Sequence, residues 1–183
     1  MMAMIELDNL AMDALDELLR EARGIWNNPN AKYAKYRQIE IDKRGSFGER
    51  LFKDAFGRIY HRRSDITYQD GDQGDWDIKL NGWKFEVKTS SLDVNKKFQN
   101  EGLKQVGDYD GVMFLGVAPE QLFVKFVKKD DIPFDELHNR EQAKTGRGWK
   151  WDFKLGEMTP VDSLEDIQKE FEKSCPFAML QKK

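Results

Sequence analysis

Two short apolar runs dominate the second half of the chain. Residues 112–117 read Val-Met-Phe-Leu-Gly-Val and residues 122–127 read Leu-Phe-Val-Lys-Phe-Val, with Pro119 and Glu120 between them. A run of this length with few polar interruptions is typical of a strand buried on both faces. The pattern therefore predicts two neighbouring buried strands joined by a turn.

Other elements follow from apolar residues at helical spacing and from signals that begin or end helices. Apolar residues recur near helical spacing in 8–23, and Gly24 follows as a stop. Ser163 and Asp166 are close to a capping box, which predicts a helix over 163–173. The remaining predicted elements are a basic helix over 31–43, a helix over 47–56 ended by Gly57, a strand within 59–68, a polar helix over 95–106, a short helix over 131–138 and an irregular stretch over 139–156.

Asn81 and Gly82 stand between two alternating segments. Asn-Gly is the strongest short-range signal for a two-residue type I′ hairpin turn, because both central positions need positive φ. A loop of two residues fixes the register, so that Asp77 faces Glu86. Strand alternation then predicts two faces: Asp75, Asp77, Glu86 and Lys88 on one, and Trp76, Ile78, Phe85 and Val87 on the other.

The expected pairing of Asp77 with Glu86 is chemically informative. Two carboxylates directly opposite each other in a sheet repel by up to about 1 kcal/mol when exposed. A divalent cation removes this repulsion and prefers oxygen ligands of this kind. The pair therefore indicates a candidate metal site. The alternative is a solvated sheet face, on which alternating charged residues are common.

Composition limits the chemistry further. The chain has 183 residues, of which 34% are charged and 39% hydrophobic, and we expect one soluble domain with no membrane partner. No run approaches the ~20 apolar residues of a transmembrane helix, and the N-terminus does not resemble a signal peptide. The single cysteine, Cys175, excludes an internal disulfide and favours a reducing, cytoplasmic compartment. With only two histidines, carboxylates would have to bind any metal, which favours Mg²⁺ or, as a substitute, Mn²⁺.

The formal net charge of −3 conceals a segregated distribution. Residues 31–63 hold ten Lys or Arg against four Asp or Glu, whereas residues 64–77 hold five Asp and no base. Segregation of this kind can present a basic surface to phosphates despite an acidic total. Charge runs are equally common on faces that are merely solvated.

Asp77, followed nine residues later by Glu86-Val87-Lys88, resembles the signature of the PD-(D/E)xK nuclease superfamily, which includes most type II restriction endonucleases and archaeal Holliday-junction resolvases. The family pattern is an acidic residue at the start of one strand and Glu-x-Lys on the next. The proline that names the signature is absent before Asp77. Residues 43–52 are similar to the first core helix of members in which a helix glutamate joins the metal site, and Glu49 occupies that position.

The resemblance implies an α/β fold with a restriction-endonuclease-like three-layer core, in which a mixed central β-sheet of αβββαβ order is flanked by helices. It implies one nuclease domain with residues 43–128 as the catalytic core, residues 1–30 as an N-terminal helix and loop, and residues 129–183 as a C-terminal extension. The implied catalytic residues are Asp77, Glu86, Lys88 and Glu49, and the implied Mg²⁺ ligands are Asp77, Glu86 and the Val87 carbonyl. Asp75 is the second candidate for the aspartate.

The implied activity is Mg²⁺-dependent hydrolysis of phosphodiester bonds in double-stranded DNA by a small type II restriction-type endonuclease. Lys88 would orient the attacking water or stabilise charge on phosphorus. Such enzymes usually dimerise to cut both strands, so a homodimer is expected. A junction resolvase or repair nuclease, a toxin-type ribonuclease and a non-cleaving DNA-binding module of the same fold are the alternatives.

Candidate DNA contacts lie outside the signature. Lys104 and Gln105 follow the Glu-x-Lys segment, and Gln105 with Tyr109 is similar to a Gln-x-x-x-Tyr pair of exonuclease-like members. In the stretch 139–154, Arg147 and Lys150 flank Trp149, a combination suited to phosphate contact and base stacking. The plainer alternative is that the tryptophans pack in the core.

Glu49 also has a structural alternative. Ser46-Phe47-Gly48-Glu49 fits a capping box, in which Glu49 would only bind a backbone N–H at the start of the helix.

Overall fold

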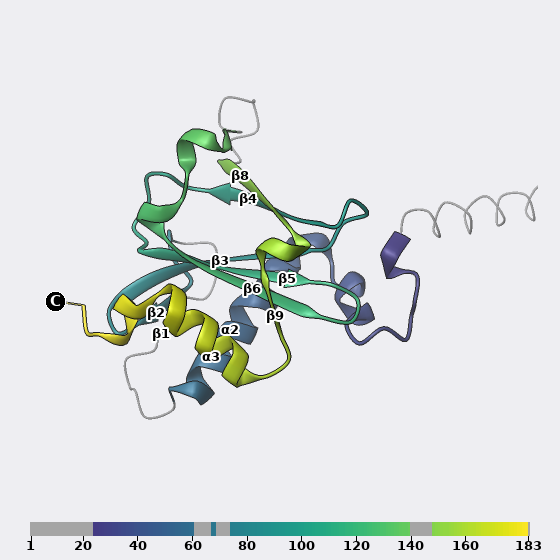
Figure 1. Cartoon of the computed structure of the whole chain (residues 1–183), viewed down its shortest axis with the longest axis horizontal. Helices are drawn as coiled ribbons and strands as arrows, with labels where there is room; N and C mark the ends of the chain where they lie inside the picture. The colour runs from purple at the N-terminus through teal and green to yellow at the C-terminus, as the bar shows by residue number, and fades with distance from the viewer. Residues whose placement is uncertain (1–23, 61–66, 69–73, 140–147, 183) are drawn as a thin grey trace, which may run out of the picture.

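The computed structural model describes residues 24–60, 67–68, 74–139 and 148–182. Within these residues the chain forms three layers (Figure 1). Two α-helices cover one face of a six-stranded sheet, and a three-stranded sheet covers the other face. The architecture is therefore mixed α/β, with one helical layer and one small β layer around a central sheet.

The central sheet has the strand order β1-β2-β3-β5-β6-β9, and the small sheet has the order β4-β8-β7. The central strands are β1 (Thr67–Tyr68), β2 (Ile78–Leu80), β3 (Trp83–Ser91), β5 (Gly111–Val117), β6 (Leu122–Lys128) and β9 (Thr159–Val161). The small sheet consists of β4 (Lys97–Leu103), β7 (His138–Asn139) and β8 (Trp149–Lys154). The helical layer consists of α2 (Gly45–Ile59) and α3 (Leu164–Ser174). Short 3₁₀ helices connect these elements: η1 (Gly24–Trp26), η2 (Ala34–Gln38), η3 (Ile41–Lys43), η4 (Lys129–Asp131), η5 (Phe134–Glu136), η6 (Leu155–Glu157) and η7 (Pro176–Met179).

The two apolar runs form β5 and β6, as predicted. All seven residues of β5 are buried, because both faces of the central sheet are covered. β5 pairs in parallel with β3 and antiparallel with β6. This places the Glu-x-Lys strand beside a strand that is buried along its whole length.

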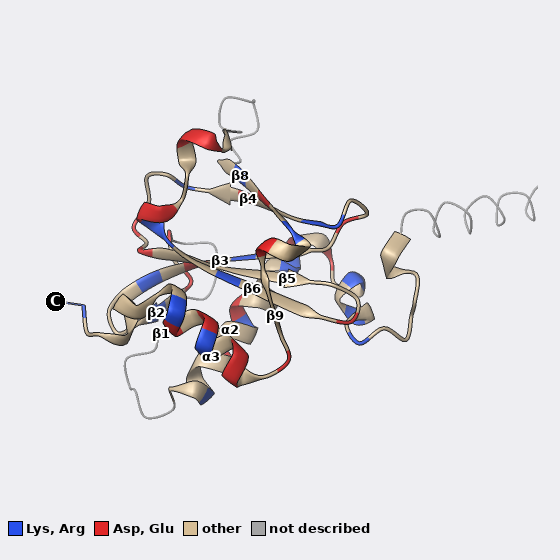
Figure 2. Ribbon diagram, viewed as in Figure 1, with Lys and Arg blue, Asp and Glu red and all other residues tan. Residues whose placement is uncertain are grey.

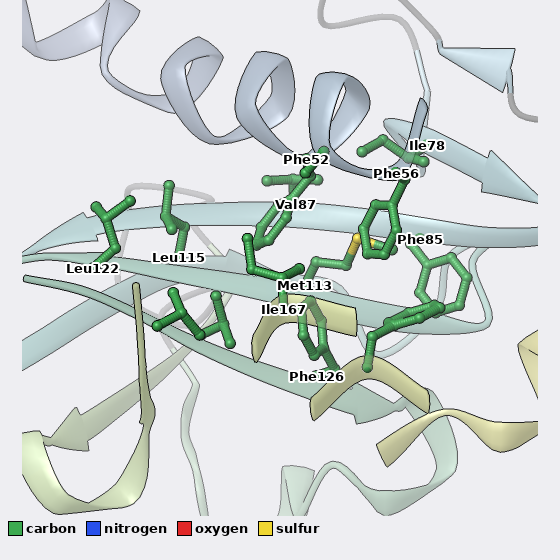
Figure 3. Packing of buried hydrophobic residues seen from close by; sticks show 14 of the residues in the cluster. Phe52, Phe56, Ile78, Phe85, Val87, Met113, Leu115, Leu122, Phe126 and Ile167 are labelled. Carbon is green, nitrogen blue, oxygen red and sulfur yellow. The ribbon is translucent and has the colours of Figure 1, made fainter. Parts of the chain in front are cut away.

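The helical layer packs on the sheet through aromatic side chains. Figure 3 shows Phe52 and Phe56 of α2 meeting Phe85, Val87 and other sheet residues. The ring of Phe56 lies 4.7 Å from that of Phe171 on α3, centroid to centroid. Aromatic pairs at this separation add about 0.5–1.5 kcal/mol beyond the area they bury. This core holds the helix-facing side of β3 rigidly in place.

A second core lies between the central sheet and the small sheet. Phe98 of β4 and Phe153 of β8 are buried against Phe114 of β5 and Phe123 of β6. The segment from residue 129 onward therefore contributes to both cores: β8 packs in this second core, and α3 packs in the core on the helical face of the central sheet.

The hairpin around Asn81 and Gly82 is confirmed. Their φ angles are 53° and 83°, and Leu80 pairs with Trp83 across the two-residue turn. Ile78 pairs with Phe85, as the expected register requires.

The helices predicted over 47–56 and 163–173 also correspond to helices. Ser163 caps α3 and forms the expected capping box with Asp166. α2 is longer than predicted, because the helix begins at Gly45 and continues through Gly57 to Ile59.

The polar helix predicted over 95–106 is wrong, because this segment forms β4. Phe98 and Leu103 are buried there, and β4 pairs with β8, which lies in the stretch predicted to be irregular. The connection from β3 to β5 is consequently a strand of another sheet rather than a helix. The αβββαβ order with helices on both faces is not what the described residues show.

Other predicted helices are shorter than expected. The basic helix over 31–43 is replaced by η2 and η3, and the helix over 131–138 by η4 and η5. The predicted strand within 59–68 is described only at Thr67–Tyr68, and the predicted helix over 8–23 lies outside the described residues. In the part of the chain that is described, no helix combines the length and the apolar character needed to cross a membrane.

Candidate functional site

The β2–β3 ladder is irregular where Asp77 approaches β3. Ile78, the first residue of β2, pairs with Phe85, yet the backbone N–H of Asp77 also donates to the Phe85 carbonyl at 2.8 Å. Two residues opposite one is the arrangement of a β-bulge. A bulge breaks strand alternation, and Trp76 accordingly packs in the second core, not beside Ile78 as predicted.

The same irregularity directs the carboxylate of Asp77 to the edge of β3. Its Oδ2 accepts a hydrogen bond of 2.6 Å from the backbone N–H of Val87. Asp77 is thus held against the middle residue of Glu-Val-Lys rather than paired directly with Glu86. In a β-strand the N–H and C=O of one residue point to the same side, so the Val87 carbonyl is also directed to this edge.

Glu86 is a buried carboxylate, with 7% of its surface exposed. Its Oε1 lies 2.5 Å from Nζ of Lys88, whereas its Oε2 has no hydrogen-bond partner among the described residues. Burial raises the pKa of Glu86, Lys88 opposes this shift, and the nearby carboxylate of Asp77 adds to it. A buried carboxylate oxygen without a partner is energetically unfavourable, and a bound cation would compensate it.

The donor set fits a hard divalent cation. Asp77, the orphaned Oε2 of Glu86 and the Val87 carbonyl supply only oxygen atoms, which Mg²⁺ prefers. Within the described residues, no group of three or more His, Cys, Asp or Glu side chains lies close enough together to hold a metal. The structure therefore brings Asp77 and Glu86 near each other but does not add Glu49 to form a three-acid group.

Glu49 lies on the second turn of α2 and is half-buried. The helix begins at Gly45 with Arg44 as its N-cap, and Arg44 makes no side-chain cap hydrogen bond. Ser46 is thus inside the helix, and the capping-box explanation for Glu49 is wrong. A catalytic role for Glu49 stays a prediction.

Asp75 does not pair with Lys88, contrary to the register. Its Oδ1 lies 2.8 Å from Nζ of Lys104, and its Oδ2 accepts a 3.0 Å hydrogen bond from the Asp108 N–H. The side-chain bond to Lys104 is the main cause that holds the pKa of Asp75 below its usual value. Asp75 is thus an ion-pair partner, and Asp77 is the better candidate for the metal-binding aspartate.

Lys104 is close enough to Glu86 for its positive charge to lower the pKa of that carboxyl. The ion pair with Asp75 holds Lys104 at this end of the sheet. Sequence reasoning missed this arrangement, because Asp75 and Lys104 lie on different segments and no short motif connects them. Gln105 is exposed, and the buried Tyr109 donates its hydroxyl to the Lys104 carbonyl. The hydroxyl of Tyr109 therefore has a structural partner.

The second group of predicted DNA contacts is only partly described. Lys150 lies on β8, where Nζ donates to Oε1 of Gln99 at 2.8 Å and lies 3.3 Å from Oδ2 of Asp152. Lys150 is thus a strand residue with local partners rather than a loop residue. Arg147 lies outside the described residues.

Comparison with known proteins adds no relative to this picture: no protein-family model matches the chain, and no curated protein matches it significantly.

Proposed function

We propose that this protein is a Mg²⁺-dependent endonuclease that hydrolyses phosphodiester bonds in double-stranded DNA, most similar in type to a small type II restriction endonuclease. The observation that carries the proposal is the state of Glu86: buried, bound through one oxygen to Lys88 and with the other oxygen unpartnered, beside an aspartate anchored on Val87. A buried carboxylate oxygen without a partner lowers stability, and such local frustration is concentrated at functional sites. Glu86 is therefore better explained by a functional role than by a structural one.

The arrangement of elements supports the same proposal. α2 precedes the hairpin, the hairpin carries Asp77 and Glu-Val-Lys, and β3 pairs in parallel with the next central strand, β5. We infer a restriction-endonuclease-like core in which β4 and β8 replace the helix expected between β3 and β5. Homodimerisation and a catalytic role for Glu49 belong to the proposal through the family resemblance alone.

Each residue of the site has a distinct task in this proposal. Asp77, Glu86 and the Val87 carbonyl would hold the metal, which when bound would polarise the scissile phosphate and lower the pKa of water. The hydrogen bond from the Val87 N–H fixes the orientation of Asp77. Lys88 holds its ammonium group beside Glu86, where it would orient the attacking water and stabilise negative charge on the phosphoryl oxygens.

The test is incubation of supercoiled plasmid, linear duplex, four-way DNA junctions and tRNA with the purified protein and Mg²⁺, followed by sequencing of the product ends. Lys88→Ala is expected to lower kcat by roughly 10²–10³-fold while circular dichroism remains native. Lys79→Ala is the matched control, because Lys79 is a lysine of the neighbouring strand β2 in the same hairpin. It should cleave like the wild type.

The other outcomes discriminate among the alternatives. Selective cleavage of junctions would identify a resolvase, and cleavage of tRNA a ribonuclease. DNA binding in Ca²⁺ without cleavage in Mg²⁺ or Mn²⁺ would identify a non-cleaving binding module. Normal turnover by Lys88→Ala would refute the assigned chemistry.

A further inference from the structure

The charges of the described residues are segregated along the chain. Residues 24–60 hold eight Lys or Arg against four Asp or Glu, whereas the other described residues hold fourteen against nineteen. Figure 2 shows basic residues on η2 and η3, the short helices before α2. The excess of positive charge therefore belongs to one region of the fold, formed by η2, η3 and α2.

Three arginines of this region form what we call the arginine surface: Arg37 on η2, Arg44 at the N-cap of α2 and Arg50 on α2. Among the described residues, none of the three guanidinium groups has an ion-pair partner. Glu40, which lies between Arg37 and Arg44 in the sequence, pairs instead with Lys43 at 3.0 Å. Within the described part of the chain, no ion pair therefore neutralises the arginine surface.

Contacts with aromatic rings and backbone carbonyls hold two of these arginines in place. The guanidinium carbon of Arg37 lies 5.9 Å from the centroid of the Trp26 ring, and that of Arg44 lies 5.8 Å from the centroid of the Tyr36 ring. Both rings belong to the core on the helical face of the central sheet. Arg44 also donates to the carbonyls of Ile39 at 3.0 Å and of Arg37 at 3.2 Å. These contacts position both guanidinium groups but leave their positive charge in place.

The two positioned charges are close enough to oppose each other. Burial lowers the pKa of Arg37, and the positive charge of Arg44 lowers it further. Two like charges that the fold holds together are electrostatically unfavourable, and an anion beside them relieves this cost. The arrangement therefore indicates an anionic ligand from outside the described residues.

Arg50 extends the arginine surface along α2. It shares a hollow of about 290 Å³ with Ile39, the residue whose carbonyl accepts from Arg44. No acidic residue lines this hollow, whose wall consists of Ile39, Lys43, Ser46, Phe47 and Arg50. The three arginines are thus contiguous through Ile39 but do not converge on one point. Separate charges of this kind fit an extended polyanion better than one small anion.

The arginine surface lies beside the candidate site but does not share it. Nη1 of Arg37 donates to Oγ of Ser91 at 3.2 Å. Ser91 is three residues beyond Lys88 on β3, or roughly 10 Å along the strand, and strand alternation places the two side chains on opposite faces. Duplex DNA carries one negative charge per about 1.7 Å of its axis. A duplex that reaches Lys88 therefore has other phosphates within reach of the arginine surface.

We propose that the arginine surface binds the sugar–phosphate backbone of duplex DNA away from the scissile phosphate, without reading its sequence. The guanidinium fork matches phosphate oxygens, and contacts to the backbone position a protein on DNA but carry no sequence information. The inference rests on the proposed nuclease function for the identity of its ligand. It assigns the surface to affinity, not to chemistry.

The test measures binding of a duplex of random sequence by fluorescence anisotropy, in Ca²⁺ instead of Mg²⁺. Affinity should fall between about 50 and 200 mM salt, and the slope of log K against log salt concentration reports the number of phosphates contacted. Arg50→Gln should reduce the magnitude of this slope by about 0.9. The triple variant Arg37→Gln, Arg44→Gln, Arg50→Gln should reduce it by about 2.7.

Arg58→Gln is the matched control, because Arg58 is an exposed arginine on the last turn of the same helix. It should retain the wild-type slope. Arg50 makes no hydrogen bond or ion pair with another described residue, so Arg50→Gln should keep a native circular dichroism spectrum. This single variant therefore tests the surface even if the triple variant does not fold.

The outcomes separate this inference from the proposed function. Cleavage of DNA by the wild type, with an unchanged slope and affinity in Arg50→Gln and in the triple variant, would overturn the inference and leave the nuclease function intact. Reduced slopes in a protein that binds DNA but cleaves nothing in Mg²⁺ or Mn²⁺ would support the surface and refute the nuclease chemistry. Binding of polyglutamate without binding of duplex DNA would assign the surface to an acidic protein and overturn the inference together with the proposed function.

Discussion

Asn81, in the turn of the hairpin that carries the candidate site, donates a 2.7 Å hydrogen bond from Nδ2 to the backbone carbonyl of Ala178. The two residues are separated by 97 positions in the sequence. The Asn81 carbonyl in turn accepts a 2.8 Å hydrogen bond from the Lys182 N–H, and Nε1 of Trp83 donates to the Leu180 carbonyl at 2.9 Å. The C-terminal segment is thus bound to the turn that sets the register of β2 and β3.

Asn81→Ala should lower the free energy of unfolding by about 2–4 kcal/mol. The substitution removes a buried hydrogen bond, and alanine tolerates the φ of 53° at this position less well than asparagine does. Asn81→Gly retains the backbone freedom and should lose only about 1–3 kcal/mol. Urea unfolding of both variants measures the difference. Equal losses would mean that the positive φ contributes nothing to the effect.

Divalent metal should stabilise the folded protein even without substrate. At a concentration about 100-fold above Kd, binding adds about 2.7 kcal/mol, or about 5–11 °C in Tm for a chain of this length. Differential scanning fluorimetry with Mg²⁺ and Mn²⁺ measures this shift. Glu86→Gln should abolish the shift, whereas Glu136→Gln, an exposed acid on η5, should retain it.

The pH dependence of that metal effect has a definite sign. Because burial raises the folded-state pKa of Glu86, its contribution to stability is complete below the unfolded-state pKa and is lost as the pH rises through the folded-state pKa. A cation binds the ionised form, so the increase in Tm should be larger at about pH 8 than at about pH 5. An increase that did not change with pH would place the metal on other groups.

Replacement of the Glu86–Lys88 pair by methionines should separate stability from function. Buried ion pairs are often neutral or inferior to apolar residues of similar volume, so Glu86→Met with Lys88→Met should raise the free energy of unfolding by about 1–4 kcal/mol and abolish cleavage. Lys88→Met alone leaves Glu86 uncompensated and should destabilise the protein by up to about 3 kcal/mol. Chemical denaturation together with the plasmid assay checks both statements. If the double variant were less stable than the wild type, the charged pair would be a stabilising interaction and not a source of local frustration.

Two glycines of α2 should respond in opposite directions to alanine. A Cβ on Gly48 would collide with Oγ1 of Thr89 on β3, whereas a Cβ on Gly57 meets nothing within 4 Å. Gly57→Ala should therefore raise the free energy of unfolding by about 0.5–1 kcal/mol through helix propensity. Gly48→Ala should lower it by about 1–3 kcal/mol through overpacking, and the double variant Gly48→Ala with Thr89→Ala should regain part of that loss. Thermal unfolding of these three variants tests the contact between α2 and β3.

The predictions that succeeded depend on interactions within a few residues of sequence. Asn81 and Gly82 set the hairpin register because only the turn itself must adopt positive φ. Ser163 and Asp166 start α3 by bonding to each other's backbone three positions apart. The continuous apolar run of β5 predicts burial on both faces without any knowledge of which strands pair with it.

The predictions that failed depended on partners distant in sequence. Residues 95–106 contain enough polar residues to suggest a solvated helix, but Phe98 pairs in register with Phe153, 55 residues later, and is buried there. The bulge at Asp77 and the pairing of Asp75 with Lys104 are likewise set by packing across the sheet. No short stretch of the sequence contains a motif that predicts either arrangement.

By itself the sequence determined the turn, the buried strands β5 and β6, the capped helix α3 and the set of charged groups around Glu86-Val87-Lys88, because turn chemistry, apolar run length and capping are local. Only the tertiary structure decided that β4 and β8 cover the face bearing Glu86 and that Asp77 is anchored on Val87. Burial and the local electrostatic environment arise from residues brought together by folding, and these are the quantities that turn a carboxylate on a strand into a candidate ligand.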